Sequence, residues 1–130
     1  MKLQIGKAAI AAALMFSACG PALAQVSAVT QREIAHLLAY VASPGCEFNR
    51  NGTWYKGSKA REHLKEKYDY LERRRMLTNA ESFIERAAST SSMSGKPYLV
   101  RCGGGAATPS ATWLTNELKR YRGASGNGAS

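Results

Sequence analysis

The side chains best suited to acid–base chemistry are the two histidines of this 130-residue chain, His36 and His63. A hydrolase would use His63 as general base and Ser91 or Ser92 as nucleophile. Glu81 is the carboxylate that would orient the imidazole. However, the chain has no Gly-x-Ser-x-Gly motif, and serines after a helix commonly serve local capping. We therefore predict a non-enzymatic domain and keep a small hydrolase as an alternative hypothesis.

Metal-binding and phosphate-binding patterns are absent from the sequence. No cysteine lies in a C-x-x-C motif, and the histidines have no neighbours at metal-ligand spacing. The run Gly103-Gly104-Gly105 lacks the lysine that follows the glycines of a phosphate-binding loop. We expect no metal and no cofactor.

Basic residues are in excess, with 18 Lys and Arg against 9 Asp and Glu. Many of them fall between Arg50 and Arg75, with two aromatic residues, Trp54 and Tyr55, among them. Such a surface could bind nucleic acid, anionic lipid or acidic wall polymers. Acidic residues interrupt it, so we expect no nucleic-acid partner and keep an envelope-surface binder as a third hypothesis.

The first 24 residues are typical of a bacterial export signal. Lys2 and Lys7 precede an apolar run over 8–18, and Ala22-Leu23-Ala24 provides the small residues of a cleavage site. We predict cleavage after Ala24 and a periplasmic or secreted protein. The alternative is a lipoprotein acylated at Cys19, because residues 16–19 resemble a lipobox. No other apolar run is long enough for a transmembrane helix.

Either processing route leaves Cys46 and Cys102 as the cysteine pair of the mature domain. Export would place them in an oxidising compartment, where a disulfide is the default state. We therefore predict a Cys46–Cys102 disulfide.

The expected helices and strands, in the order α-β-β-α-α-β-α, predict one α+β domain over residues 25–122. The expected strands are residues 46–50 and 53–56, which flank an Asn51-Gly52 turn, and residues 97–102. Antiparallel pairing of the first and last of these brings the cysteines together, giving a three-stranded sheet of order 2-1-3. Residues 123–130 are expected to form a disordered tail.

About four helices are expected, each with an apolar stripe at helical spacing. The first is capped by Thr30 with Glu33, the second by Ser58, and the third by Thr78 with Glu81. A last helix follows Ser110. The predicted core residues on the four stripes are Ile34, Leu37, Leu38 and Val41; Ala60, Leu64, Tyr68 and Leu71; Phe83, Ile84, Ala87 and Ala88; and Trp113, Leu114, Leu118 and Tyr121.

The chain resembles the YfeK-like family of small exported bacterial proteins, domain-of-unknown-function family 5329. The resemblance rests on residues 48–52, on Ala60 with His63-Leu64 and Lys67, and most specifically on the pattern from Thr78 to Tyr98. It implies export and a single small domain, and it implies no activity.

The resemblance also selects positions within the chain. Asn51, Gly52, Glu81 and Gly95 have structural explanations in turns and caps. Five polar residues are explained less easily by turns and caps: Arg50, His63, Lys67, Ser91 and Ser92. These five and Lys96, which also matches the motif, are the candidate residues for a ligand or a polar network. Two interpretations are open: a cationic pocket for a small anionic ligand or a partner's carboxylate, or a polar network that fixes the serine loop to the second helix.

Overall fold

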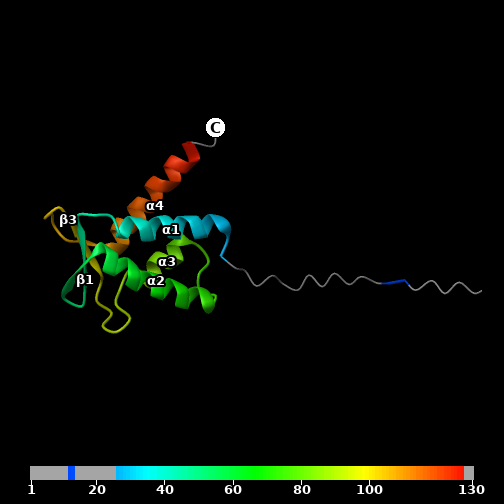
Figure 1. The fold of residues 1–130 in the computed structure, drawn as a ribbon, viewed down its shortest axis with the longest axis horizontal. Coiled ribbons are helices and arrows are strands. Elements are labelled where there is room, and N and C mark those ends of the chain that lie inside the picture. The colour runs from blue at the N-terminus through cyan, green and yellow to red at the C-terminus, as the bar shows by residue number, and fades with distance from the viewer. Residues whose placement is uncertain (1–11, 14–25, 128–130) are drawn as a thin grey trace, which may run out of the picture.

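A computed structural model describes residues 12–13 and 26–127 (Figure 1). The predicted cleavage site and the lipobox alternative at Cys19 lie outside these residues. No helix within the described ranges is long and apolar enough to cross a membrane.

The domain is α+β, as predicted, with four helices and one antiparallel sheet. The elements in chain order are α1 (Ala28–Val41), β1 (Cys46–Arg50), β2 (Thr53–Lys56), α2 (Gly57–Arg73), α3 (Ala80–Ala87), β3 (Leu99–Cys102), β4 (Thr108–Pro109) and α4 (Ser110–Asn127).

The sheet has four strands in the order β2-β1-β3-β4, so the prediction of three strands was incomplete. The missing strand, β4, has two residues and contains a proline. Such a segment carries no alternating pattern, and it pairs with β3 only because the chain reverses after Cys102. The predicted partial order 2-1-3 is confirmed.

The register of the sheet confirms both the turn and the disulfide. Cys46 pairs directly with Cys102 across β1 and β3, and the two are bonded. At the other end of β1, Asn51 and Gly52 have φ angles of 53° and 87°. These positive angles are those of a type I′ turn, which joins antiparallel strands tightly.

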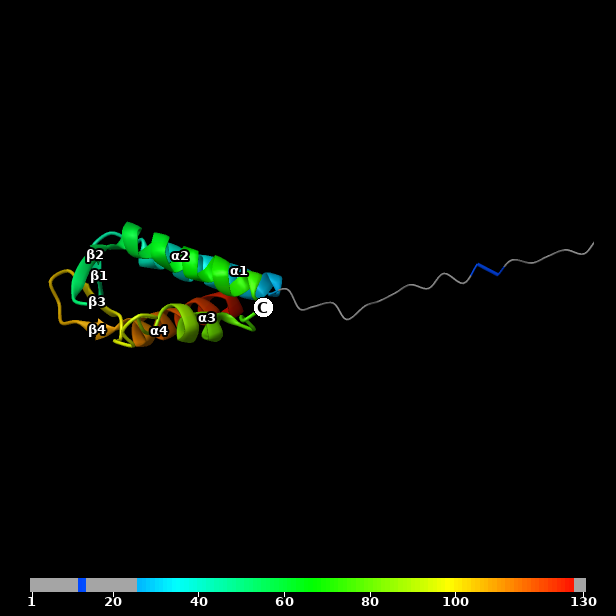
Figure 2. The same cartoon turned by 90° about the horizontal axis from the view of Figure 1, so that it is seen from below.

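The four helices form two layers, α1 with α2 and α3 with α4, and the sheet covers one end (Figure 2). Most residues of the predicted stripes are buried in the space between the layers. Ala60, Tyr68 and Trp113 are only partly buried against this core, and Tyr121 instead stacks on His36 at 4.1 Å. Phe83, Ile34, Leu37 and Leu114 are among the most completely buried side chains, and Phe48 and Val100 bring the sheet into the same core. This packing determines where α2 meets β1, which is where the candidate site lies.

The predicted caps of α1 and α2 were wrong. Ser27 caps α1 and accepts from the Thr30 amide at 3.1 Å, so Thr30 lies one turn inside the helix. Helix α2 follows β2 directly, without a side-chain cap from Ser58. Gly57 occupies its first position because a Cβ there would lie 2.4 Å from the Val41 carbonyl oxygen.

The predicted cap of α3 was displaced by one residue. Asn79 is the N-cap and forms a reciprocal capping box with Ser82, instead of Thr78 with Glu81. Asn is at least as good a cap as Thr, and the two residues are adjacent, so spacing alone did not separate them. Glu81 instead pairs with Arg122 of α4.

Helix α4 continues to Asn127, so the predicted tail was wrong for residues 123–127. Arg122 anchors this end of the helix. Its guanidinium donates to Glu33, whose nearly buried carboxylate lies 2.7 Å away, and also pairs with Glu81. A second contact, from His36 to Glu117 at 2.6 Å, ties α4 to α1 one turn earlier.

Candidate functional site

Three separate elements bring the candidate residues together. Arg50 ends β1, and His63 and Lys67 lie one turn apart on the same side of α2. Asn49 pairs with Leu99, so Arg50 lies beside Tyr98, the residue before β3. We call Arg50, His63, Lys67 and Tyr98 the His63 site.

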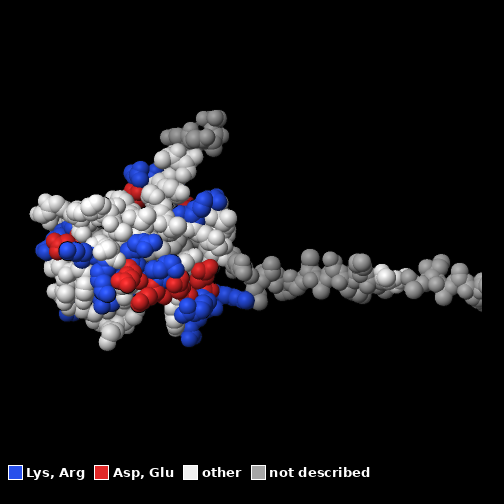
Figure 3. All heavy atoms as spheres, viewed as in Figure 1, with Lys and Arg blue, Asp and Glu red and all other residues white. Residues whose placement is uncertain are grey.

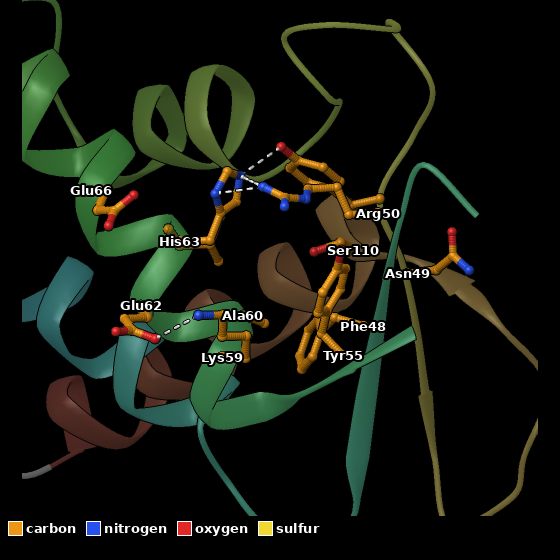
Figure 4. A pocket seen from close by; sticks show the side chains of 12 residues that line it. Phe48, Asn49, Arg50, Tyr55, Lys59, Ala60, Glu62, His63, Glu66 and Ser110 are labelled. Atoms are coloured by element: carbon orange, nitrogen blue, oxygen red, sulfur yellow. Dashed lines mark hydrogen bonds and ion pairs between the residues drawn. The ribbon is translucent and has the colours of Figure 1, made fainter. Parts of the chain in front are cut away.

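The imidazole of His63 lies between a guanidinium and a phenol. Nη1 of Arg50 is 2.8 Å from Nδ1 and 3.1 Å from Nε2 of His63 (Figure 4). Nε2 is also 3.3 Å from the Tyr98 hydroxyl. Because a guanidinium can only donate, we assign Nδ1 as the acceptor from Arg50 and Nε2–H as the donor to Tyr98.

Lys67 completes the site from the other side. Its ammonium donates to the Tyr98 hydroxyl at 3.2 Å and to the Thr90 carbonyl at 3.4 Å, and it lies 5.2 Å from the Tyr98 ring centre. The Tyr98 oxygen therefore accepts from both Lys67 and His63. Its own proton has no acceptor among the described residues and is free to donate.

Burial and charge favour the neutral imidazole. Desolvation lowers the pKa of His63 below its ordinary value of 6.5, and the positive charges of Arg50 and Lys67 lower it further, against a weaker opposing effect of Glu66. Desolvation and then Arg50 also lower the pKa of Lys67. Desolvation raises the pKa of Tyr98, which is 6 % exposed.

The two cations of the site have no carboxylate partner within residues 12–13 and 26–127. Among the described residues, neither Arg50 nor Lys67 has a carboxylate oxygen within 4.0 Å. Arg120 and Arg122, by contrast, each bind carboxylates at about 2.6–2.7 Å. The positive charge of the site is thus not neutralised by direct pairing.

Two hollows meet at His63. The first, of about 250 Å³, has one apolar wall that includes Phe48 and Tyr55, with polar and charged side chains around it and Arg50 at one end (Figure 4). The second, of about 240 Å³, is lined by Lys67 and Ser92 among others. His63 and Glu66 line both. Arg50, His63, Lys67 and Ser92 therefore lie around two adjoining hollows that share the imidazole.

The serines serve different purposes. Ser91 is 4 % exposed, and its hydroxyl accepts from the backbone of Met93 and Ser94, which closes a turn. Ser92 lines the second hollow. In the described part of the chain, His63 forms no hydrogen bond with either Ser91 or Ser92, so a serine–histidine pair is not assembled.

The remaining predicted residues lie at the edge of the site or outside it. Lys96 is exposed and lines neither hollow. Asn51 at the hairpin tip accepts from the Ser94 hydroxyl at 2.5 Å, which links the turn to the serine loop. Gly95 has a φ of 71°, which suits glycine there.

Sequence reasoning missed Tyr98 as a member of the His63 site and Ser110 as a lining residue of the first hollow. Tyr98 belongs to the motif from Thr78 to Tyr98, but it was interpreted as a strand residue. Ser110 was interpreted as a helix cap, whereas it is 1 % exposed and lines the first hollow. The signal for Tyr98 was its motif position combined with the Cys46–Cys102 register, which places it next to Arg50.

The charged surface outside the site is mixed. Acidic and basic side chains interleave over α2 (Figure 3), including the pairs Lys65–Asp69 at 2.7 Å and Lys59–Glu62 at 3.5 Å. This face is not a continuous basic patch. Among the described residues, no group of three His, Cys, Asp or Glu side chains could hold a metal ion.

The fold and site define a small disulfide-linked α+β domain with a cationic, histidine-centred site. The chain belongs to a family of unknown function, DUF5329, whose model matches residues 28–122. The match covers all four strands, three complete helices and most of α4. No match was found among curated proteins, and none among solved structures.

Proposed function

We propose that this protein is a non-enzymatic binding domain of the cell envelope and that it holds a small anion at the His63 site. The main support for an anion is that two cations, Arg50 and Lys67, lie at the site without a carboxylate partner among the described residues. Guanidinium and ammonium groups at a partly desolvated site bind anions through charge-assisted hydrogen bonds.

The hydrogen-bonding pattern supports the same conclusion. The Tyr98 proton and the N–H groups of Arg50 other than the one on His63 have no acceptor in the described part of the chain and can donate to a ligand. An anion that accepts from them would reduce the repulsion between Arg50 and Lys67. It would also raise the pKa of His63, because a nearby negative charge favours the imidazolium.

Binding can be tested by titrating acetate into the purified protein while the His63 imidazole is followed by NMR. We expect saturable shifts and an increase in the pKa of His63 at saturation. Arg50→Gln is expected to weaken binding at least tenfold. Lys65→Gln is the matched control, since Lys65 lies on α2 but pairs with Asp69 away from the site. Equal affinity of Arg50→Gln and the wild type would contradict the proposal.

A polar network without a ligand is the competing interpretation of the same residues. It is favoured by the contact of Lys67 with the Thr90 carbonyl, which joins α2 to the start of the serine loop. Lys67→Gln separates the two: a network predicts lower stability with unchanged anion affinity, whereas the binding site predicts weaker affinity.

We also propose that the protein is exported and belongs to the YfeK-like group of its family. Residues 1–24 have the pattern of an export signal, and a disulfide persists in oxidising compartments. The intact mass of protein recovered from the cell envelope tests this. A mass that begins at Gln25 supports cleavage after Ala24, and a lipid-modified Cys19 supports the lipoprotein. Recovery of unprocessed chain from the cytosol alone would refute export.

A further inference from the structure

The first hollow combines an apolar wall with a cationic end, and this combination defines a ligand class. We propose that it takes an organic monocarboxylate with a compact apolar body, such as an aromatic ring or a short branched chain. This inference rests on the proposed anion site and adds the part of the ligand that is not charged.

The apolar wall is built mainly by the hairpin. Phe48 and Tyr55 pair directly across β1 and β2, so their rings project from the same face of the sheet. Ala60 and Leu64 of α2 add apolar surface to the same hollow. Figure 4 shows Phe48 and Tyr55 together at the end of the hollow away from His63. Aromatic walls of this kind bury flat apolar groups.

The carboxylate would lie where the wall meets the His63 site. The Arg50 guanidinium lies 5.3 Å from the centre of the Tyr55 ring and also contacts His63. It therefore reaches both parts of the hollow. Only Nη1 is engaged by the imidazole, so further N–H groups of the planar fork are available for a carboxylate.

A second donor is provided by Ser110. This residue is 1 % exposed and lines the hollow, and its backbone N–H donates to the Tyr98 carbonyl at 2.8 Å, which holds it beside the His63 site. Figure 4 places it between Arg50 and the two aromatic rings. As the first residue of α4 it also lies at the positive end of a long helix. A carboxylate bound by Arg50 would have the Ser110 hydroxyl within the same hollow.

Size and charge limit the ligand. A volume of about 250 Å³ is below the roughly 300–1,000 Å³ of pockets that hold drug-sized molecules. Glu62 and Glu66 also line the hollow, and their negative charges disfavour a dianion. Since Lys59 is paired with Glu62, the local excess of positive charge is small. A monocarboxylate fits this balance better than a phosphate.

The experiment measures dissociation constants for matched probes on the disulfide-bonded protein. Benzoate carries charge and ring, acetate carries charge alone, and benzamide carries the ring without charge. We expect benzoate to bind at least tenfold more tightly than both, with shifts at the amides of Tyr55 and Ser110. N-acetylphenylalanine and its amide test whether the same carboxylate comes from a peptide C-terminus: tighter binding of the free acid than of benzoate would identify that source.

Two variants of β2 provide the structural control. Tyr55→Leu is expected to remove the preference for benzoate over acetate. Trp54→Leu is expected to leave it unchanged, because Trp54 is the next residue along the strand and stacks instead on Arg101, at 3.8 Å. A thermal unfolding curve for each variant confirms that it is folded.

The outcomes distinguish the two proposals. Equal affinity for benzoate and acetate would overturn the proposal that the hollow binds an apolar group, but it would still support the anion site. Equal affinity for benzoate and benzamide would overturn both, because the carboxylate would then contribute nothing. Absence of binding by every probe would also overturn both. Tighter binding of inorganic phosphate than of benzoate would overturn the monocarboxylate while supporting an anion site.

Discussion

Removal of the Cys46–Cys102 disulfide should lower the free energy of unfolding by about 4 kcal/mol. The bond joins residues separated by 56 positions, and the chain-entropy model converts a loop of that length into about 4 kcal/mol at 25 °C. Small domains have total stabilities of about 5–15 kcal/mol. Loss of the bond should therefore leave the domain marginally folded.

Urea unfolding followed by tryptophan fluorescence measures this effect. For an m-value of about 2 kcal/mol/M, the midpoint should fall by about 2 M urea in the reduced protein. The double variant Cys46→Ala/Cys102→Ala should behave like the reduced wild type. Because the effect acts mainly on the unfolded chain, amide chemical shifts remote from the two cysteines should stay unchanged in the folded reduced protein.

Two results would contradict this role of the disulfide. Midpoints that differ by less than about 0.5 M urea, with equal m-values, would mean that the loop contributes little to stability. A folded reduced protein with widespread shift changes over α2 and the hairpin would mean that the bond acts by holding the native sheet together. In that case Arg50 and Tyr98, which neighbour each other across the same strand pair, would move apart.

Three further predictions concern the site, the core and a cap. The pKa of His63 is lower in the folded protein than in the unfolded chain, so protonation favours unfolding. The stability of the wild type relative to His63→Gln should therefore be fully present above pH 6.5 and should fall as the pH drops below that value. Denaturation curves at several pH values measure this, and a stability difference that does not change with pH would contradict a shifted pKa. Phe83→Ala should cost about 3–5 kcal/mol in urea unfolding, since this ring is fully buried between the helix layers; a cost below about 1 kcal/mol would contradict that packing. Asn79→Ala should cost about 1 kcal/mol in the same assay, and Thr78→Ala much less. A larger cost for Thr78→Ala than for Asn79→Ala would support Thr78 as the N-cap instead.

Sequence patterns predicted the parts of the fold that depend on near neighbours. The stripe from Ile34 to Val41 and the Asn51-Gly52 turn follow from helical spacing and from the φ angles that turn residues tolerate. The pairing of Cys46 with Cys102 followed from the number of cysteines and the expected compartment. The stripe and the turn depend on neighbouring residues, and the disulfide on there being one pair of cysteines in the mature domain. Predicting them therefore needs no knowledge of how the helices and strands pack.

The caps and the ends of elements were less predictable because several neighbouring residues can serve the same purpose. Thr78 and Asn79 are both good caps, and the choice depends on how α3 packs. Helix α4 extends to Asn127, beyond the last predicted apolar position, and Arg122 near its end is held by Glu33 of α1, 89 residues away. No spacing rule links such distant positions.

The candidate site shows the same division. From residue types and family motif, the sequence by itself identified Arg50, His63 and Lys67 as polar residues in need of an explanation. Only the tertiary structure placed Tyr98 against the imidazole and Ser110 in the first hollow. Their positions depend on the register of β1 with β3 and on the packing of α2 against the hairpin. These are long-range contacts, determined by the burial of one shared core rather than by the order of residues along any single segment.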